Sequence, residues 1–457
     1  MKRLVFCFDG SWNQIDAPHP TNVLFTAESV LPMTADGTAQ VIFYDEGVGT
    51  EKGEKLTGGM FGKGLEKNLN DAYRFLIFNH TPGDEIYVFG FSRGAFTARS
   101  FAGLISNCGI LSRRYAGRVN ETLQRYRTRE DTDASRMRLM TYRSEFCPEV
   151  CVSQVEDSWR VANVKDYRSG QSPLLSIRYL GVWDTVGSLG IPAYLVGAAI
   201  SNKEHQFHDL KLSRFVESAR HAVAIDERKL DFRPTLWENL DDLNAAKGFK
   251  PEAADAPYQQ KWFPGNHGSV GGGGDRRGLS DQALDWIWDG ARHAGLRLDT
   301  SQHSRIYELA PSDLTWLDNT TDKPNFLNVI GFVIDKLPVG DREPGPRQLH
   351  EVSVGARRRW HQPPKDLPEG SAYRPRTLEP VHGALDALDP VQLGIGALPP
   401  NGGFTIHEVA QHETLSGIAV SYYNDAGEWP RIFEANKYKI DDPDKIYIGQ
   451  VLRIPKL

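Results

Sequence analysis

Residues 85–100, EIYVFGFSRGAFTARS, have the pattern of a strand, a sharp turn that carries a serine, and the start of a helix. The apolar run before Gly90 predicts a buried strand, and Gly90, Ser92 and Gly94 fit the G-x-S-x-G elbow. The two glycines remove side chains that would collide where a strand turns sharply into a helix. A backbone amide and the helix dipole would face any oxyanion formed beside Ser92. The stretch therefore predicts a nucleophilic serine, although an ordinary strand-helix turn can share the pattern.

Length and composition set the class of protein. The chain has 457 residues, of which 40% are hydrophobic, so it can form one large α/β domain and a smaller one. Its formal net charge of −6 argues against a general nucleic-acid partner, because neutralising phosphates requires a basic surface. Cys147 and Cys151 lack a second pair of ligands nearby, and Cys7 lies in a predicted core strand. We expect neither a metal site nor an organic cofactor.

The N-terminal residues do not have the pattern of a secretory signal. Only a short apolar run separates Met1-Lys2-Arg3 from Asp9, and no apolar run in the chain reaches the roughly 18 residues that a membrane span needs. We therefore expect a chain made in the cytoplasm that needs another device for export.

Several further elements follow from the pattern. Continuous apolar runs predict parallel strands at Leu4 to Phe8, Val41 to Tyr44 and Ile177 to Trp183. A glycine-rich loop at 58–64 is expected before a helix from about Leu65 to Phe78, and 112–170 is expected to be helical and to lie on the surface. Helices are also expected over Ser213 to Ile225 and over Gln282 to Ala294, the latter capped by Ser280 and Asp281.

An acid and a base can be chosen to accompany Ser92. Asp184 follows a predicted strand, and open α/β sheets place their sites at the carboxyl ends of strands. His267 lies among glycines on a loop, whereas His221 lies among apolar residues, as a core histidine would. The chain order Ser92, Asp184, His267 is that of the α/β-hydrolase triad.

Each of these residues has an expected role. Ser92 would attack an acyl carbonyl, His267 would take and return its proton, and Asp184 would fix the imidazole tautomer. The Arg93 backbone amide is one expected oxyanion donor, and Gly10 or Ser11 is the second. The apolar run within 188–212 is expected to form a mobile flap over the site.

Six motifs together resemble one known family. They are FDGSWN at 8–13, TNV at 21–23, GFSRGAFTARSFAGLI at 90–105, GVWDTVGSLG at 181–190, ARHAVAIDER at 219–228 and WFPGNHGSVGGG at 262–273. This pattern resembles the α/β-hydrolase domain family that includes bacterial type VI secretion phospholipase effectors. The resemblance implies a mostly parallel sheet flanked by helices over residues 1–380, with the nucleophile, acid and base at Ser92, Asp184 and His267. Phe91 departs from members that carry histidine there, a change expected to alter acyl-chain contacts.

The C-terminal residues form a separate pattern. Prolines and glycines mark a linker over 381–403, and residues 404–457 predict a small β-α-α-β module. The stretches HETLSGIAVSYY at 412–423, WPRIFEANK at 429–437 and DPDKIYIGQVLRIP at 442–455 resemble a LysM domain. That resemblance implies binding to peptidoglycan or another N-acetylglucosamine-containing glycan. His412 and Glu413 replace the more usual Gly-Asp pair, so a packing or docking role stays open. The linker predicts little contact with the first domain.

These observations predict a serine esterase, specifically a phospholipase that acts on bacterial membrane lipids. The resemblance implies delivery by a type VI apparatus into the periplasm of a target cell, with a secretion-spike protein and an immunity protein as partners. Two alternatives stay open. One is a deacylase of cell-wall glycans, and the other is a non-catalytic cell-wall-binding protein that docks on the spike.

Overall fold

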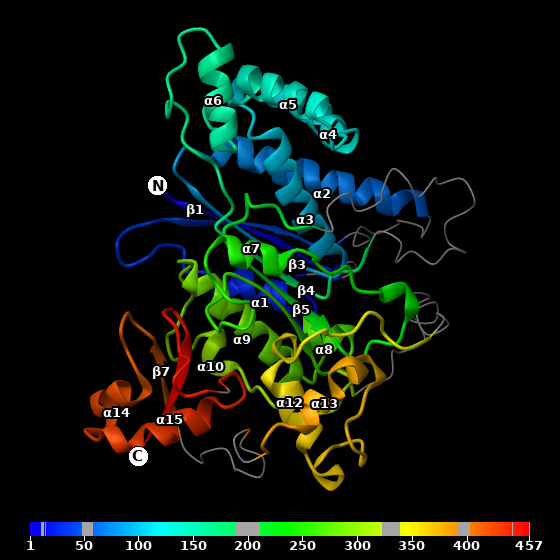
Figure 1. The fold of residues 1–457 in the computed structure, drawn as a ribbon, viewed down its shortest axis with the longest axis vertical. Helices are drawn as coiled ribbons and strands as arrows, with labels where there is room; N and C mark the ends of the chain where they lie inside the picture. The colour runs from blue at the N-terminus through cyan, green and yellow to red at the C-terminus, as the bar shows by residue number, and fades with distance from the viewer. Residues whose placement is uncertain are drawn as a thin grey trace.

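The computed structural model describes residues 1–10, 13, 15–47, 58–187, 211–321, 339–390, 393, 403–440 and 442–456 (Figure 1). Ser11 and nearly all of the predicted flap at 188–212 lie outside these residues. Among the described residues, no helix combines the length and the apolar character needed to cross a bilayer.

A six-stranded parallel sheet forms the centre of the molecule, in the order β2-β1-β3-β4-β5-β6. Its strands are β1 (Arg3–Phe8), β2 (Gln40–Asp45), β3 (Glu85–Phe91), β4 (Tyr179–Trp183), β5 (Ala219–Ala224) and β6 (Tyr258–Phe263). The register pairs Phe8 with Gly90 and Phe91 with Trp183, so the ends of β1, β3 and β4 meet at one edge. The sheet confirms the predicted fold class and the three predicted strands.

Helices cover both faces of this sheet (Figure 1). The α-helices of this part are α1 (Asn22–Ser29), α2 (Gly58–Asn79), α3 (Arg93–Cys108), α4 (Val119–Arg127), α5 (Asp133–Phe146), α6 (Gln154–Asn163), α7 (Leu240–Ala246), α8 (His267–Gly271), α9 (Gly278–His293), α10 (Arg305–Glu308), α12 (Val354–His361) and α13 (His382–Asp386). Short 3-10 helices are η1 (Arg113–Arg118), η3 (Leu230–Phe232), η4 (Leu349–Glu351), η5 (Pro364–Asp366) and η6 (Arg376–Val381).

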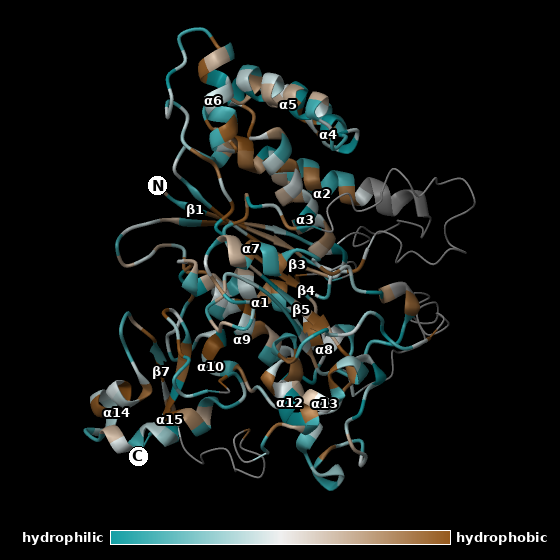
Figure 2. Ribbon diagram, viewed as in Figure 1, coloured by the Kyte–Doolittle hydropathy of each residue, from teal (hydrophilic) through white to brown (hydrophobic). Residues whose placement is uncertain are grey.

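Alternating side chains of β1 enter two different cores. Phe6 packs among buried residues of α2 and α3, including Leu76 and Phe101, whereas Val5 belongs to the core formed with α1 and α9. Burial on both faces explains why the strand is a continuous apolar run rather than an alternating one. In Figure 2 the central strands are largely brown, which marks hydrophobic residues, whereas many outer segments are teal, which marks hydrophilic ones.

Three expected local features are wrong. Residues expected to form a helix from Ser213 to Ile225 instead contain strand β5, in which every residue is buried. Arg220 and His221 obscure the strand pattern, but each has hydrogen-bond partners in the core. Helix α9 begins at Gly278, so Ser280 lies inside it and donates to the Arg277 carbonyl. The expected glycine-rich loop is likewise the first part of α2, which begins at Gly58.

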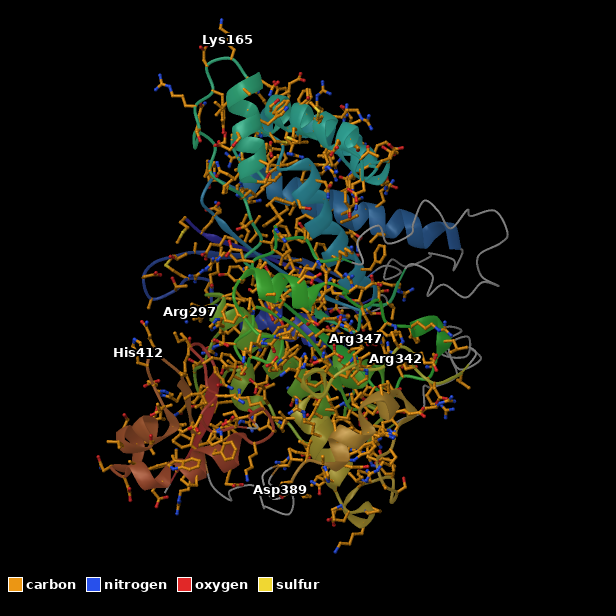
Figure 3. The ribbon with its side chains drawn as sticks, in the orientation of Figure 1. Lys165, Arg297, Arg342, Arg347, Asp389 and His412 are labelled. Carbon is orange, nitrogen blue, oxygen red and sulfur yellow. The ribbon has the colours of Figure 1, made fainter. Side chains whose placement is uncertain are left out.

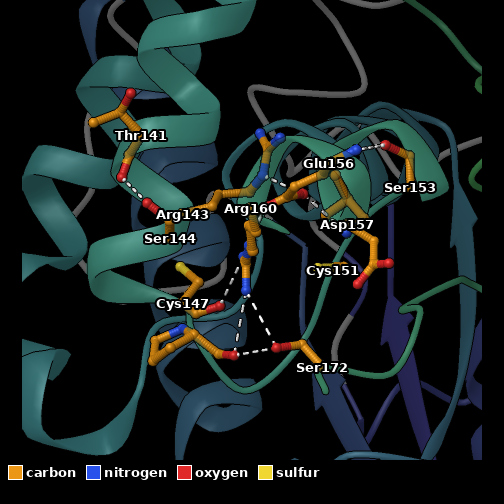
Figure 4. Close-up of polar contacts among 12 residues, drawn as sticks. Thr141, Arg143, Ser144, Cys147, Cys151, Ser153, Glu156, Asp157, Arg160 and Ser172 are labelled. Atoms are coloured by element: carbon orange, nitrogen blue, oxygen red, sulfur yellow. Dashed lines mark hydrogen bonds and ion pairs between the residues drawn. The ribbon is translucent and has the colours of Figure 1, made fainter. Parts of the chain in front are cut away.

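The predicted helical region at 112–170 forms η1, α4, α5 and α6 above α3 (Figure 1). It is more than a surface layer, because buried Tyr142 and Phe146 extend the core beneath α5. Glu156 accepts from Arg143 at 2.9 Å and from Arg160 at 2.6 Å, with all three side chains buried (Figure 4). This ion cluster joins α5 to α6.

The last part of the first domain packs against the far end of the sheet. Val352 forms an isolated parallel β-bridge with Trp262 of β6. Trp360 of α12 is buried in an apolar cluster that includes Val223 of β5. Residues 349–385 therefore share a core with β5 and β6.

The C-terminal module has the predicted β-α-α-β order. Its elements are β7 (Phe404–Glu408), α14 (Leu415–Tyr423), η7 (Ala426–Glu428), α15 (Trp429–Asn436) and β8 (Val451–Pro455), and β7 pairs antiparallel with β8. A small apolar core that includes Ile418, Ile432 and Leu452 holds the two helices against the strands.

This module packs against α9, contrary to the expectation of little contact. Lys439 lies 2.9 Å from a carboxylate oxygen of Asp285 and 3.3 Å from one of Asp289. The Val451 amide donates to Asp289 at 3.1 Å, and Glu408 pairs with Arg292. A Pro/Gly-rich linker thus connects two units that share a buried polar interface.

Candidate active site

Ser92 lies in the turn between β3 and α3, with φ of 57° and ψ of −121°. A side chain on Gly90 would place its Cβ 2.4 Å from the Gly94 carbonyl oxygen, and a Cβ on Gly94 would lie 2.2 Å from the Phe8 carbonyl oxygen. Both glycines are therefore required by the backbone path. Holding a non-glycine residue at positive φ costs on the order of 1–3 kcal/mol, a strain that is common where a nucleophile must be presented.

The structure brings the three predicted residues together at one edge of the sheet. The imidazole Nε2 of His267 lies 2.8 Å from Ser92 Oγ, and its Nδ1 lies 2.6 Å from Asp184 Oδ2. Asp184 follows β4 and His267 begins α8, so three separate segments supply the contacts. In this geometry the imidazole can accept the serine proton while the carboxylate holds the opposite nitrogen.

A buried arginine that sequence reasoning missed lies behind Asp184. The guanidinium Nη2 of Arg342 is 2.9 Å from Asp184 Oδ2, and both side chains are almost fully buried. Burial opposes ionisation of Asp184, but Arg342 and the His267 hydrogen bond outweigh it and lower its pKa to about 2. No motif in the sequence marks Arg342, because it follows a long segment that matches no pattern.

Two aromatic rings contact the His267 imidazole. The Phe232 ring is stacked at a centroid distance of 5.0 Å and an interplanar angle of 10°, and the Phe91 ring lies at 4.6 Å. A Cβ on Gly271 would lie 2.0 Å from the Phe91 ring, so that ring fills the space beside α8. The position where Phe91 departs from some relatives therefore contacts the imidazole. The expected change in acyl-chain contacts stays a prediction.

The two expected oxyanion donors are placed differently. Arg93 is the first residue of α3, directly after Ser92. The Gly10 amide donates to the Asp9 carboxylate at 2.6 Å, so it would have to leave that partner to serve an oxyanion. Asp9 also accepts from Thr21 at 2.6 Å and from Tyr44 at 2.9 Å. Burial raises the pKa of Asp9 to about 6, although these hydrogen bonds oppose the shift.

His221 lies where a core histidine is expected. It is fully buried in β5, where Nε2 accepts from the Thr185 amide at 3.2 Å and Nδ1 lies 2.9 Å from Gln260 Oε1. Burial lowers its pKa to about 3, so the ring is neutral at physiological pH. The preference for His267 over His221 agrees with this placement.

The cysteines are all free and buried, at positions 7, 108, 147 and 151. Within the described ranges, no group of three or more His, Cys, Asp or Glu side chains is arranged to hold a metal ion.

Comparisons with known proteins give two regional matches and several distant relatives. Residues 407–455 match the LysM domain. An uncharacterized protein of Saccharomyces cerevisiae, YEL023C, is 28% identical over 247 residues, which are 51% of this chain and 32% of that protein. The potassium binding protein Kbp of Escherichia coli O6:H1 is 38% identical over 74 residues, which are 16% of this chain and 50% of that protein. The chain thus spans half or less of the curated relatives it matches.

Two solved structures show weak likeness. The Tle1 effector bound to the VgrG spike of the type 6 secretion system has a TM-score of 0.30 at 17% identity, covering 59% of this chain and 50% of that chain. An uncharacterized protein from Pseudomonas aeruginosa has a TM-score of 0.34 at 14% identity, covering 98% of this chain and 75% of that chain. More than half of the sequence, residues 2–290, matches the catalytic domain described as "T6SS, Phospholipase effector Tle1-like", and the chain therefore belongs to that family.

Proposed function

We propose that the chain is a serine ester hydrolase whose nucleophile, base and acid are Ser92, His267 and Asp184. The observation that carries the proposal is the continuous contact from Ser92 Oγ through the imidazole to Asp184, on an elbow that only glycines permit. A buried structural serine would not need a strained backbone and a histidine held by a carboxylate.

In the first half of the reaction, Ser92 Oγ forms a bond to the acyl carbon while His267 Nε2 takes the hydroxyl proton. The ester C–O bond then breaks, and the imidazolium returns the proton to the leaving alkoxide. In the second half, His267 takes a proton from water while the water oxygen forms a bond to the acyl carbon. The bond between that carbon and Ser92 Oγ then breaks, the imidazolium returns the proton to Ser92 Oγ, and the carboxylic acid leaves. Asp184 holds the imidazole orientation in both halves.

The proposed substrate is an acyl ester of a bacterial membrane phospholipid. Membership of a family of type VI secretion phospholipase effectors supports this substrate and delivery by a type VI apparatus. We further propose that delivery is into a target-cell periplasm, with a spike protein and an immunity protein as partners. The expected division places catalysis in residues 1–380, a linker in 381–403 and the second module in 404–457, the last of which contains the match of residues 407–455 to LysM. We propose that the first domain continues past 380, because Val381 and Leu385 are buried in the core it shares with β5 and β6.

The LysM match favours a second candidate function. A module of this kind would bind N-acetylglucosamine-containing glycan, and it packs directly on α9 of the hydrolase. A serine esterase that removes acyl groups from cell-wall glycans would bring substrate and enzyme together through that module. The same geometry also fits a docking role without glycan.

One experiment separates these possibilities. The full chain is treated with a fluorophosphonate probe, which labels an activated serine whatever the natural substrate, and then with a panel of phosphatidyl lipids and O-acetylated peptidoglycan. Ser92→Ala is compared with Ser100→Ala, a matched change at a buried serine within helix α3. We expect Ser92→Ala to lose labelling and roughly 10⁶-fold in turnover, because the nucleophile is removed.

The outcomes are distinct. Fatty-acid release from phospholipid by the wild type and by Ser100→Ala supports the phospholipase, whereas release of acetate from peptidoglycan alone supports the deacylase. No labelling of wild-type Ser92, or labelling of Ser92→Ala equal to wild type, would overturn the hydrolase assignment.

A further inference from the structure

Arg342 contacts the triad from a part of the chain far beyond the elbow motif. Figure 3 labels Arg342 on the segment that follows residue 339, well apart from His412 of the C-terminal module. Its side chain is only 2% exposed and reaches Asp184, the Ala224 carbonyl and the Phe232 carbonyl. Each of these partners belongs to, or directly supports, the predicted acid and base.

The contact with Asp184 is made at a particular oxygen. Asp184 Oδ1 accepts from the Ala224 amide at 2.9 Å, whereas Oδ2 accepts from both His267 Nδ1 and Arg342 Nη2. One carboxylate oxygen is therefore shared between the imidazole and a permanent cation. A buried arginine is always charged, so its field acts on the imidazole through the oxygen that both contact.

The second contact positions an aromatic ring. Arg342 Nη2 donates to the Phe232 carbonyl at 2.7 Å, and the Phe232 ring is stacked on the imidazole. The same guanidinium thereby fixes the carboxylate at one edge of His267 and the ring that covers its face.

We propose that Arg342 is a positioning residue of the active site, which orients Asp184 and Phe232 about His267 and offsets part of the carboxylate charge felt by the imidazole. This inference rests on the proposed hydrolase function.

Other titratable groups lie near His267 or near the residues that contact it. Glu227 accepts from the His267 backbone amide at 3.1 Å, Lys229 lies over the Phe232 ring at 5.9 Å, and His221 contacts the amide of Thr185. Asp9 precedes Gly10, where an added Cβ would lie 3.0 Å from the Phe91 ring, and its raised pKa of about 6 can add an acid limb to the pH profile. Since Asp9 does not contact Arg342, its titration should not respond to a change at position 342.

The test measures kcat, KM and the rate of fluorophosphonate labelling against pH for the full chain with a short p-nitrophenyl ester. We expect Arg342→Gln to lower kcat by roughly 10- to 100-fold at neutral pH with little change in KM, because misplaced catalytic groups lose rate and the buried side chain does not contact substrate.

Three variants make the result specific. Arg342→Lys keeps the charge but should restore only part of kcat, since an ammonium cannot reproduce the three contacts of the guanidinium. Arg376→Gln, at an exposed arginine paired with Asp341, should leave all parameters within about two-fold. Asp9→Asn identifies any acid limb of the pH–activity profile that arises from titration of Asp9.

The last comparison asks whether the losses of activity caused by changes at Arg342 and at Asp184 are coupled. Because Arg342 is proposed to act mainly through Asp184, Arg342→Gln should cost much less in an Asp184→Asn background than alone. Additive losses in the double variant, or a loss that appears in KM rather than in kcat, would overturn the inference while leaving the hydrolase intact. A failure of the proposed function would instead appear as a wild-type chain that neither labels at Ser92 nor turns over. If Arg342→Gln does not fold, the kcat of Arg342→Lys decides, and a wild-type value would count against the proposal.

Discussion

The ammonium of Lys439 in the C-terminal module lies 2.9 Å from the carboxylate of Asp285 in α9, with both side chains about 5% exposed. Asp289 lies 3.3 Å from the same ammonium, and Tyr438 donates to Asp285 at 2.8 Å. Burial alone would lower the pKa of Lys439, but the two carboxylates raise it well above the ordinary value, so the lysine stays charged. The modules are therefore joined by a buried ion cluster as well as by the linker.

This cluster predicts that the C-terminal module stabilises the first domain. Lys439→Met should lower the free energy of unfolding by about 3–5 kcal/mol, because it leaves two buried carboxylates without their cation. Urea denaturation followed by tryptophan fluorescence measures the change. Lys445→Met is the matched control, since that lysine is exposed and pairs with Asp442 beside it in the chain.

A deletion of residues 391–457 tests the same interface without a substitution. It removes Lys439 and also Val451, which is buried in the core that contains α9. We expect a lower melting temperature than that of the full chain. Equal melting temperatures, together with a neutral Lys439→Met, would show that the module is independent, as the linker predicts.

Asp9 should make stability depend on pH in a defined direction. Its folded pKa of about 6 lies above the ordinary value of 3.8, so its stabilising contribution is complete below 3.8 and is lost as pH rises through about 6. The stability of the wild type relative to Asp9→Asn should therefore fall by about 1–3 kcal/mol between about pH 4.5 and about pH 8. Chemical denaturation at both pH values measures it, and the exposed Asp16→Asn should show no such change. A constant or rising difference would contradict the assignment.

The close backbone contacts at the elbow predict that Gly94 cannot be replaced by a residue with a side chain. A Cβ there would lie 2.2 Å from the Phe8 carbonyl oxygen and 2.4 Å from that of Asp9, both of which are backbone atoms that cannot rotate away. Gly94→Ala should therefore displace β1 from α3, lower the melting temperature and abolish fluorophosphonate labelling. Gly117→Ala, where a new Cβ meets nothing within 4 Å, should leave both measurements unchanged. Wild-type labelling of Gly94→Ala would mean that the turn has another geometry.

The sequence predicts the centre of this fold well because burial on both faces makes parallel strands apolar throughout. The runs that became β1 and β4 carry few polar residues, and the glycines about Ser92 mark a turn that other residues cannot form. Strand β5 escaped recognition because Arg220 and His221 are polar. Their partners, the Trp286 carbonyl and Gln260, come from elements far along the chain.

The candidate site also contains some residues that the sequence predicts and one that it does not. The sequence predicts three of these residues, Ser92, Asp184 and His267, because each follows a strand or stands among glycines. Their chain order is also that of the α/β-hydrolase triad. The sequence does not predict Arg342, because its role comes from contacts with Asp184 and Phe232 that only the folded chain creates. The docking of the C-terminal module was hidden for a related reason. Asp285 and Asp289 lie one turn apart on α9, and their spacing gives no sign that a lysine from another module neutralises them.

That docking also constrains how such a chain can change during evolution. A domain on a loose linker can be exchanged for another without harm to its neighbour. Here an incoming module that lacked a cation at the place of Lys439 would leave Asp285 and Asp289 buried and unneutralised, so the exchange would destabilise the first domain itself. Positions 285, 289 and 439 should therefore vary together among relatives that carry both units, and relatives without the second unit should have lost the two buried carboxylates.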